Sequence, residues 1–186
     1  KTALADDDIK AKVDVTSANS INIARWLPQQ IYYFAALQQT DGENIVMSVP
    51  SGNFGNLAAG MLALKSGLPI KRFIAACNAN DVVPRFLLTN EYEPRPSVQT
   101  LSNAMDVGNP SNFVRILEMF GGDTQAVKEV LSATSVSDEV TKQTMRDVYE
   151  QCNYILDPHG AVAYRALADE IKDSETGIFL EKAHQI

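Results

Sequence analysis

Cysteine is scarce in this sequence. Cys77 and Cys152 are the two cysteines among 186 residues, and neither belongs to a CxxC pair or has a histidine-rich neighbourhood. Structural zinc sites and disulfide frameworks both depend on numerous or closely spaced cysteines. We therefore expect neither feature and no bound metal, and the two isolated thiols indicate a reducing location, the cytoplasm.

Long apolar runs and an excess of positive charge are also missing. No stretch of eighteen apolar residues and no basic leader is present, so neither a membrane span nor a signal peptide is predicted. With 16 basic and 23 acidic residues the net charge is −7, and the isoelectric point is about 4.8. Non-specific binding to nucleic acid or anionic lipid requires clustered Lys and Arg. We expect neither partner, and any bound anion needs a local site.

The remaining composition is that of a globular chain. Hydrophobic residues make up 45% and charged residues 21% of the sequence, both ordinary values. The length suits one compact domain or a large piece of a bigger one. Because the chain begins at Lys1 rather than at a methionine, we expect a piece of a larger protein.

The clearest structural pattern lies between residues 44 and 77. Asn44–Val49 is a short apolar run typical of a strand buried on both faces. A glycine turn at Pro50–Asn56 and a helix-forming segment at Leu57–Ser66 follow it, and Arg72–Cys77 is a second apolar run. Strand, turn, helix and strand in this order predict a right-handed βαβ unit with parallel strands. The fold class expected is α/β, a parallel sheet between two layers of helices.

Helices are predicted on both sides of this unit. Before it, apolar residues at helical spacing predict an amphipathic or buried helix within residues 19–40, with Trp26 and Tyr33 widening the stripe of Ile23, Leu27, Ile31 and Phe34. Pro28 predicts a kink or a fresh helix start there. After the unit, further helices are expected at residues 81–88, 110–120, 124–131, 138–149 and 157–171, and a last strand at 177–180.

The SGNFGN turn is the best candidate for a binding site. Glycines let an anion approach the backbone, and the first unpaired amides of the following helix point toward it. The turn matches neither GxxxxGK[ST] nor GxGxxG, so a phosphate ester smaller than a nucleotide fits better. A purely structural turn is the alternative on geometry alone.

Four sequence stretches resemble the threonine synthase family. SVPSGNFGNLAAG resembles the loop with which fold-type-II pyridoxal-phosphate enzymes hold the cofactor phosphate. The stretches SANSINIARWLPQQIYYF, AMDVGNPSNFVRIL and LDPHGAVAYRAL narrow the resemblance to the threonine synthases of bacteria and yeast. Together they cover nearly the whole chain, in the order expected for that family.

The resemblance implies a reaction and two phosphate sites. The family converts O-phosphohomoserine and water to threonine and phosphate with pyridoxal 5'-phosphate as cofactor, a carbon–oxygen lyase reaction. By resemblance, the cofactor phosphate is held chiefly by main-chain amides of Gly52, Asn53, Phe54, Gly55 and Asn56. The substrate phosphate is held by Asn19, Ser20 and Arg25, and an arginine fork pairs well with phosphate oxygens. Without the resemblance, Ser20 would be interpreted as a helix cap and Arg25 as a surface charge.

The lysine that the chemistry requires has no counterpart in this chain. The family's Schiff-base lysine lies in an upstream motif of the AFKD type, which is absent here, and Lys65 and Lys71 are interpreted as surface residues. Lys182 in FLEKAHQI replaces the threonine expected near the pyridine nitrogen, and a cation cannot accept that hydrogen bond. We assign no catalytic residue and expect the chain alone to be inactive.

The resemblance also suggests a division into three parts. Residues 1–40 would carry the substrate-phosphate helix, 41–121 the cofactor-binding α/β core, and 122–186 a helical C-terminal part of a larger two-domain enzyme. Its expected partners are the substrate and the N-terminal remainder of the same enzyme, and an oligomer is left open. The competing functions are another fold-type-II enzyme such as threonine dehydratase, whose substrate carries no phosphate, and a non-catalytic phosphate-binding module.

Further polar residues are weighed against structural roles. Ser111, Asn112 and Arg115 in PSNFVR could line the site, but Ser111 and Asn112 could also cap a helix, and capping is the favoured interpretation for these two. Asp106 is left unassigned. His159, in a DPH motif, either shapes the cleft or starts a helix, and the second role is favoured.

Overall fold

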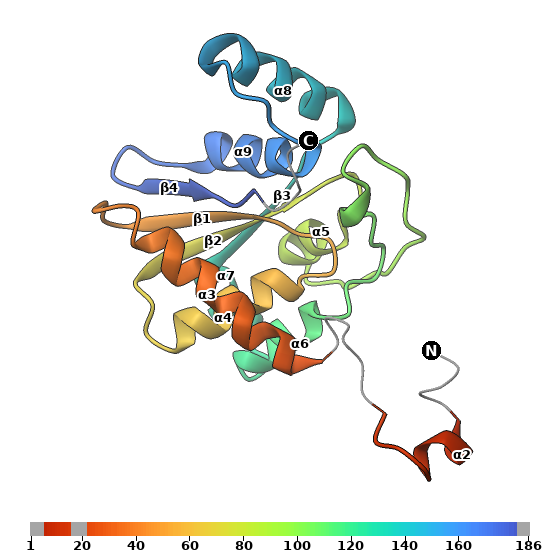
Figure 1. Cartoon of the computed structure of the whole chain (residues 1–186). Helices are drawn as coiled ribbons and strands as arrows, with labels where there is room; N and C mark the ends of the chain where they lie inside the picture. Colours follow the sequence, from red (N-terminus) through yellow and green to blue (C-terminus); the bar gives the residue numbers. More distant parts are fainter. Residues whose placement is uncertain (1–5, 16–21, 182–186) are drawn as a thin grey trace.

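A four-stranded parallel sheet organises the molecule. The computed structural model describes residues 6–15 and 22–181. Within them the strand order is β3-β2-β1-β4, and every pairing is parallel. The strands are β1 (Ile45–Pro50), β2 (Ile70–Cys77), β3 (Leu131–Ser135) and β4 (Thr176–Phe179). The predicted α/β class is confirmed (Figure 1).

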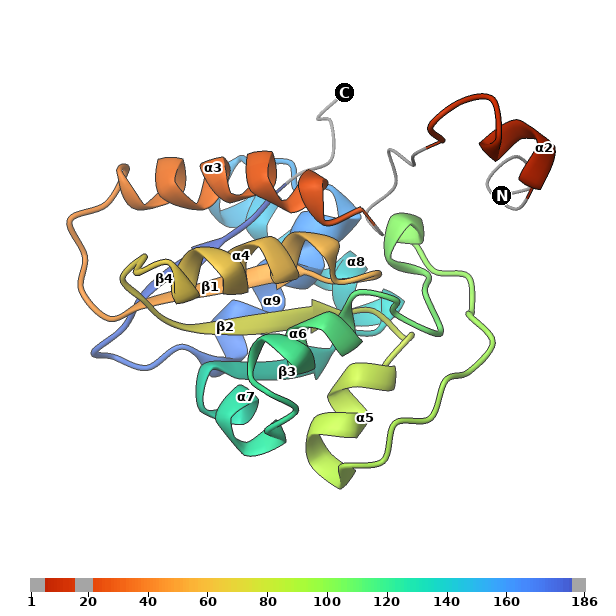
Figure 2. The ribbon, with the colours of Figure 1, turned by 90° about the horizontal axis from the view of Figure 1, so that it is seen from below.

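Helices cover both faces of this sheet (Figures 1 and 2). One face carries α3 (Trp26–Leu37), α4 (Gly55–Lys65), α5 (Val82–Thr89), α6 (Phe113–Met119) and α7 (Thr124–Val130). On the other face α9 (Pro158–Glu170) packs on the sheet and α8 (Asp138–Cys152) packs on α9. A short helix, α2 (Asp7–Lys10), and two 3-10 turns, η1 (Ile23–Arg25) and η2 (Asn103–Met105), complete the described elements.

Strand β1 lies between two apolar clusters and is buried along its whole length. Met47 and Val49 belong to the cluster formed with α3, α4 and α6, whereas Val46 belongs to the cluster formed with α9. Such two-sided burial is why the strand is an almost continuous apolar run in the sequence. The predicted unit of β1, α4 and β2 is therefore confirmed.

The connections place a topological switch point at the carboxyl end of β1. Through α4 the chain passes from β1 to β2, and much later it returns through α9 to β4, on the other edge of β1. Open parallel sheets bind ligands in the crevice outside the strand ends at such a point. The SGNFGN turn directly follows β1, so the topology places it where a ligand is expected.

Helix α3 presents a different face to the core from the one predicted. Ile23, Leu27, Ile31 and Phe34 are 60%, 60%, 67% and 44% exposed, while Trp26 and Tyr33 are almost fully buried. Apolar residues occur on both sides of this helix, so their spacing does not identify the inner face. The two large aromatic rings decide it, and Tyr33 packs edge-on against Phe73 of β2. Pro28 lies in the first turn of α3, which agrees with the predicted alternative of a fresh helix start rather than a kink.

Strand β3 was missed by the sequence reasoning. The helix expected at residues 124–131 ends at Val130, and Leu131–Ser135 pairs with β2 instead. Of these five residues only Leu131 is buried, so the segment lacks the apolar pattern of a central strand. Together with β4, this strand places two of the four described strands within residues 122–186, the part predicted to be helical. The three-part division itself stays a prediction.

A partly buried ion network lies at the end of the sheet opposite the turn. Arg72 of β2 donates to Glu175 at 2.9 Å and to Glu170 at 3.4 Å, and Lys71 contacts Glu175 at 3.0 Å. The Glu175 side chain is only 1% exposed, and the Arg72 guanidinium lowers the pKa of that carboxyl to about 2. These contacts join β2 to the segment leading into β4. In the described part of the chain, no helix is both long and apolar enough to span a bilayer.

Candidate functional site

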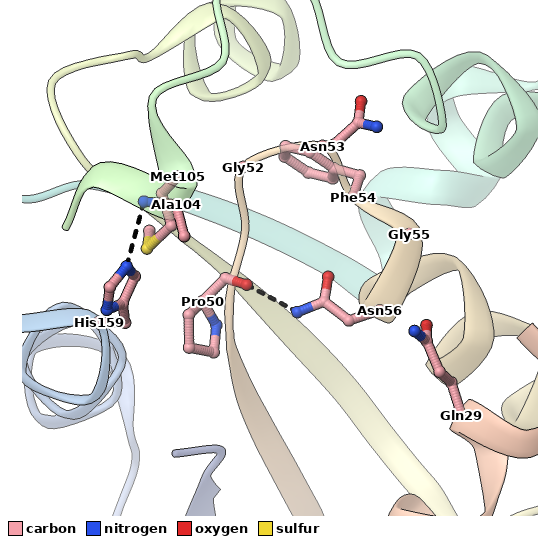
Figure 3. Close-up of a pocket in the computed structure, with 10 residues that line it drawn as sticks. All are labelled: Gln29, Pro50, Gly52, Asn53, Phe54, Gly55, Asn56, Ala104, Met105 and His159. Atoms are coloured by element: carbon pink, nitrogen blue, oxygen red, sulfur yellow. Dashed lines mark hydrogen bonds between the residues drawn. The ribbon is translucent and has the colours of Figure 1, made fainter. Parts of the chain in front are cut away.

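A cavity of about 290 Å³ opens at the carboxyl end of β1 (Figure 3). Its volume lies at the lower end of the range for small-molecule sites. All five residues predicted to hold a cofactor phosphate line it, together with Gln29, Pro50, Ala104, Met105 and His159. The turn is therefore open to a ligand and not packed shut.

The start of α4 supplies the amides that could hold an anion. Phe54 is the residue before the helix, and it has left-handed backbone angles (φ 62°, ψ 10°) and no side-chain hydrogen bond capping the helix. The first helical hydrogen bond runs from the Ala58 amide to the Phe54 carbonyl. Among the described residues, the amides of Phe54, Gly55 and Asn56 donate to no protein acceptor. Unpaired amides at a helix N-terminus favour a negatively charged group.

Phe54, the strained residue of the turn, is stabilised by burial of its aromatic ring. A non-glycine residue in the left-handed region costs about 1–2 kcal/mol. The Phe54 ring is 1% exposed and packs edge-on against Phe113, with 5.5 Å between ring centroids. Its burial stabilises a backbone conformation that turns the amides toward the cavity.

Gly52 brings the turn against the opposite wall of the cavity. A Cβ atom at this position would lie 2.6 Å from the Met105 Cα and 3.1 Å from the Ala104 carbonyl oxygen. Since these neighbours are backbone atoms, they cannot move aside as a flexible side chain would. The site requires a glycine here because of close packing, in addition to the open access predicted from sequence.

Asn53 is among the lining residues, but its side chain points away from Pro50 and Asn56 (Figure 3). Its Oδ1 accepts hydrogen bonds from the Ser111 amide at 2.7 Å and from the Ser111 hydroxyl at 2.9 Å, and its carbonyl accepts from Asn112 Nδ2 at 3.0 Å. The capping role favoured for Ser111 and Asn112 is wrong, because α6 has no side-chain cap. Both residues hold the outer side of the turn instead, a long-range contact that local sequence does not reveal.

Asn56 is held by hydrogen bonds on the inner side of the turn. Its Nδ2 donates to the Pro50 carbonyl at 2.7 Å, and its own carbonyl accepts from the Tyr33 hydroxyl at 2.7 Å. Burial raises the pKa of Tyr33 well above its ordinary value, so the hydroxyl keeps its proton and donates. Main-chain amides, rather than the two Asn side chains, are thus the groups that the turn offers to a ligand.

The far wall is formed by η2 and by the start of α9. The Ala104 amide donates to His159 Nε2 at 3.3 Å, and His159 Nδ1 lies 2.8 Å from Asp157 Oδ1. Asp157 also caps α9 through the His159 and Gly160 amides. His159 therefore combines the two roles weighed from its sequence, since it lies in the first turn of α9 and lines the cavity.

Asp106 anchors the same wall to the end of β2. Its Oδ1 accepts from Asn78 Nδ2 at 2.9 Å, from Asn80 Nδ2 at 3.2 Å and from the Thr100 hydroxyl at 2.7 Å. Asn78 follows β2 directly and is 1% exposed. Sequence reasoning assigned Asp106 no role, because its partners lie 6 to 28 residues away.

Gln29 of α3 is a lining residue that the sequence did not single out. Its Oε1 atom is buried and has no hydrogen-bond partner among the described residues. Arg25, predicted for the substrate phosphate, is exposed in η1, one turn before Gln29. Asn19, Ser20 and Lys182 lie outside the described residues. The structure thus places the five turn residues together and leaves the second predicted cluster untested.

No lysine is among the residues that line the cavity, which all belong to the described part of the chain. Lys65 ends α4 and lies over the Phe120 ring at 4.0 Å, and Lys71 pairs with Glu175. Both lie at the other end of the sheet from the cavity. The described part of the cavity can hold an anion, but it presents no amine to a carbonyl ligand.

Comparison with known proteins identifies relatives along nearly the whole chain. Residues 3–180 match the family model described as "Pyridoxal-phosphate dependent enzyme". Threonine synthase of Serratia marcescens is 52% identical over 187 residues, which cover 99% of this chain and 43% of that protein. The chain therefore spans less than half of the length of the curated relatives it matches.

Solved structures give the same result. The crystal structure of threonine synthase from Escherichia coli superposes with a TM-score of 0.91 at 49% identity, covering 98% of this chain and 43% of that one. Threonine synthase from Brucella melitensis with pyridoxal phosphate bound gives a TM-score of 0.88 at 32% identity, covering 98% and 45%. Both similarities extend over nearly the whole of this chain.

Proposed function

Because this chain belongs to the family of pyridoxal-phosphate-dependent enzymes, we propose that it is the part of a threonine synthase that holds the cofactor phosphate. The whole enzyme would convert O-phosphohomoserine and water to threonine and phosphate, as a carbon–oxygen lyase. Sequence identities of 52%, 50% and 48% to three threonine synthases support this choice within the family.

One observation carries the proposal. The turn after β1 presents unpaired amides of a helix start to a cavity of about 290 Å³. The phosphate of pyridoxal 5'-phosphate would lie against the amides of Gly52, Asn53, Phe54, Gly55 and Asn56. When bound, this cofactor supplies an electron sink for reactions at the carbons of an amino acid. The chain's own contribution is to fix the cofactor's phosphate end beside the switch point of the sheet.

A second anion site is proposed at the start of α3. Arg25 would bind the substrate phosphate together with Asn19 and Ser20. A guanidinium binds phosphate oxygens with charge-assisted, bidentate hydrogen bonds. Gln29, one turn further along the helix, lines the cofactor cavity, so α3 would connect the two phosphate sites.

The remainder of the enzyme would supply the lysine that binds the cofactor aldehyde. No lysine lines the cavity within the described residues, and the chain spans 43% of its relatives. The N-terminal remainder is therefore the partner we propose, and we assign no catalytic residue to this chain. A non-catalytic phosphate-binding role is the second candidate for the chain by itself, on the same observation about lysine.

Phosphate release tests the proposal. The isolated chain, mixed with pyridoxal phosphate and O-phosphohomoserine, should release no inorganic phosphate above the background of the two small molecules. The complete polypeptide that carries this chain should release it steadily and form threonine in equal amount. Steady turnover by the isolated chain would contradict the assignment of the lysine to the remainder. A complete polypeptide that consumed unphosphorylated threonine instead would favour a threonine dehydratase.

A further inference from the structure

We propose that His159, held by Asp157 as a neutral imidazole with its proton on Nδ1, is a positioning residue that fixes the far wall of the phosphate cavity. The inference rests on the proposed function, because the cavity it shapes is the one assigned to the cofactor phosphate. His159 would act through the backbone of η2 rather than by touching the reacting atoms.

The hydrogen bonds of His159 determine its protonation. The Ala104 amide points at Nε2, 3.3 Å away, so this nitrogen must accept and carries no proton. The other nitrogen, Nδ1, lies 2.8 Å from Asp157 Oδ1 and therefore donates to that oxygen. With one ring nitrogen accepting and the other donating, the neutral imidazole satisfies both contacts.

Asp157 is held in place to orient this ring. Its Oδ1 accepts from the His159 amide at 2.7 Å and from the Gly160 amide at 3.4 Å, which caps α9. The positive end of the α9 dipole stabilises its negative charge. Its Oδ2 is buried without a hydrogen-bond partner among the described residues. Within the described part of the chain, all hydrogen bonds of the Asp157 carboxyl group therefore run through Oδ1, the atom that orients the His159 ring.

The wall that His159 holds is in contact with the phosphate turn. A Cβ atom on Gly52 would lie 2.6 Å from the Met105 Cα, so η2 and the turn touch through their backbones. Asp106 ties η2 to the end of β2, and His159 ties it to α9 on the other face of the sheet. Figure 3 shows His159 reaching to Ala104 on the side of the cavity opposite Asn56. Loss of the His159 contact would let η2 move and leave the amides of the turn less well placed.

Titration with pyridoxal phosphate and with pyridoxal, which lacks the phosphate, tests this role in the full 186-residue chain. His159→Ala should weaken binding of pyridoxal phosphate roughly 5- to 10-fold, the value of one hydrogen bond, and should change pyridoxal binding by less than about 2-fold. His159→Gln should restore most of the affinity, because its side-chain oxygen can accept from the Ala104 amide. Arg165→Gln, a partly exposed position on α9 that does not line the cavity, is the matched control and should bind as the unmodified chain does.

The outcomes separate this inference from the proposed function. Equal pyridoxal phosphate affinity in His159→Ala and the unmodified chain would overturn the positioning role and leave the proposed function intact. The positioning role would also be overturned if His159→Gln lost as much pyridoxal phosphate affinity as His159→Ala while circular dichroism showed both variants folded. Such a result would indicate a general packing role for His159. An unmodified chain that did not prefer pyridoxal phosphate over pyridoxal would overturn both.

Discussion

At the scale of single residues, the candidate site depends on backbone placement. The side chains of Asn53 and Asn56 hold the turn against the segment before α6 and against β1. Phe54 tolerates a left-handed conformation because its ring is buried, and Gly52 allows the turn to touch η2. The side chains thus set the geometry, while the amides are exposed to the cavity.

Gly52→Ala tests this arrangement. The added Cβ meets backbone atoms of η2, so we expect an overpacking cost of about 1–3 kcal/mol and at least a roughly tenfold loss of pyridoxal phosphate affinity. The measurements are thermal unfolding and ligand titration. Gly177→Ala is the matched control, because its Cβ would meet the Ile171 and Leu167 side chains, and Gly177 pairs with Val46 near the start of β1, away from the cavity. It should lower the free energy of unfolding similarly and leave the preference for pyridoxal phosphate over pyridoxal unchanged.

Arg25→Ala tests the proposed substrate site separately. In the complete enzyme we expect KM for O-phosphohomoserine to rise roughly tenfold or more, the value of a charged hydrogen bond. The cofactor affinity should change by less than about twofold, since Arg25 is not among the residues lining the cofactor cavity. Steady-state kinetics and cofactor titration on the same preparation measure both. Equal losses in the two would contradict the assignment of separate phosphate sites.

At the scale of secondary-structure elements, sequence predicted best where one pattern was dominant. β1, α4 and β2 followed from apolar runs separated by a glycine turn, because strands buried on both faces carry a continuous signal. The inner face of α3 was wrong, since apolar residues occur on both sides of that helix. β3 was missed because its residues are mostly half-exposed and its pairing with β2 is a long-range contact.

In the candidate site, too, the sequence predicted the local motif but not the long-range contacts. The five turn residues were predicted from a local motif and its resemblance, and the cavity contains all of them. Gln29, Ala104 and His159 come from three distant parts of the chain, and only the topology of the sheet brings them together. A network such as that of Asp106 leaves no local signal, because each of its bonds joins short polar residues across loops.

The ion network joining β2 to the segment before β4 gives a pH prediction. The pKa of Glu175 is lowered from 4.5 in the unfolded chain to about 2 in the fold, so its contribution to stability is complete above pH of about 4.5 and is lost as the pH falls toward about 2. Glu175→Gln should therefore lower the unfolding midpoint in urea at pH 7, and the difference from the unmodified chain should shrink in acid. The exposed Glu129→Gln is the control. A difference that stayed constant down to pH 3 would show that the Glu175 charge does not act as described.

At the scale of the whole molecule, the proposed cofactor site is divided between this chain and the part of the enzyme that the chain does not span. The sheet, both helix layers and the phosphate turn lie within the described residues, whereas the lysine and the rest of the cofactor's surroundings would come from the remaining length of a threonine synthase. Cofactor phosphate binding and chemistry are thus assigned to different parts of the polypeptide. Binding of the phosphate is the property this chain should retain.

Direct titration of the 186-residue chain with pyridoxal phosphate tests that claim best. Binding followed by calorimetry should exceed that of pyridoxal by at least roughly tenfold, because the unpaired amides at the start of α4 contact only the phosphate group. Inorganic phosphate should compete with pyridoxal phosphate for the same site. Equal affinity for pyridoxal and pyridoxal phosphate, with no competition by phosphate, would contradict the account.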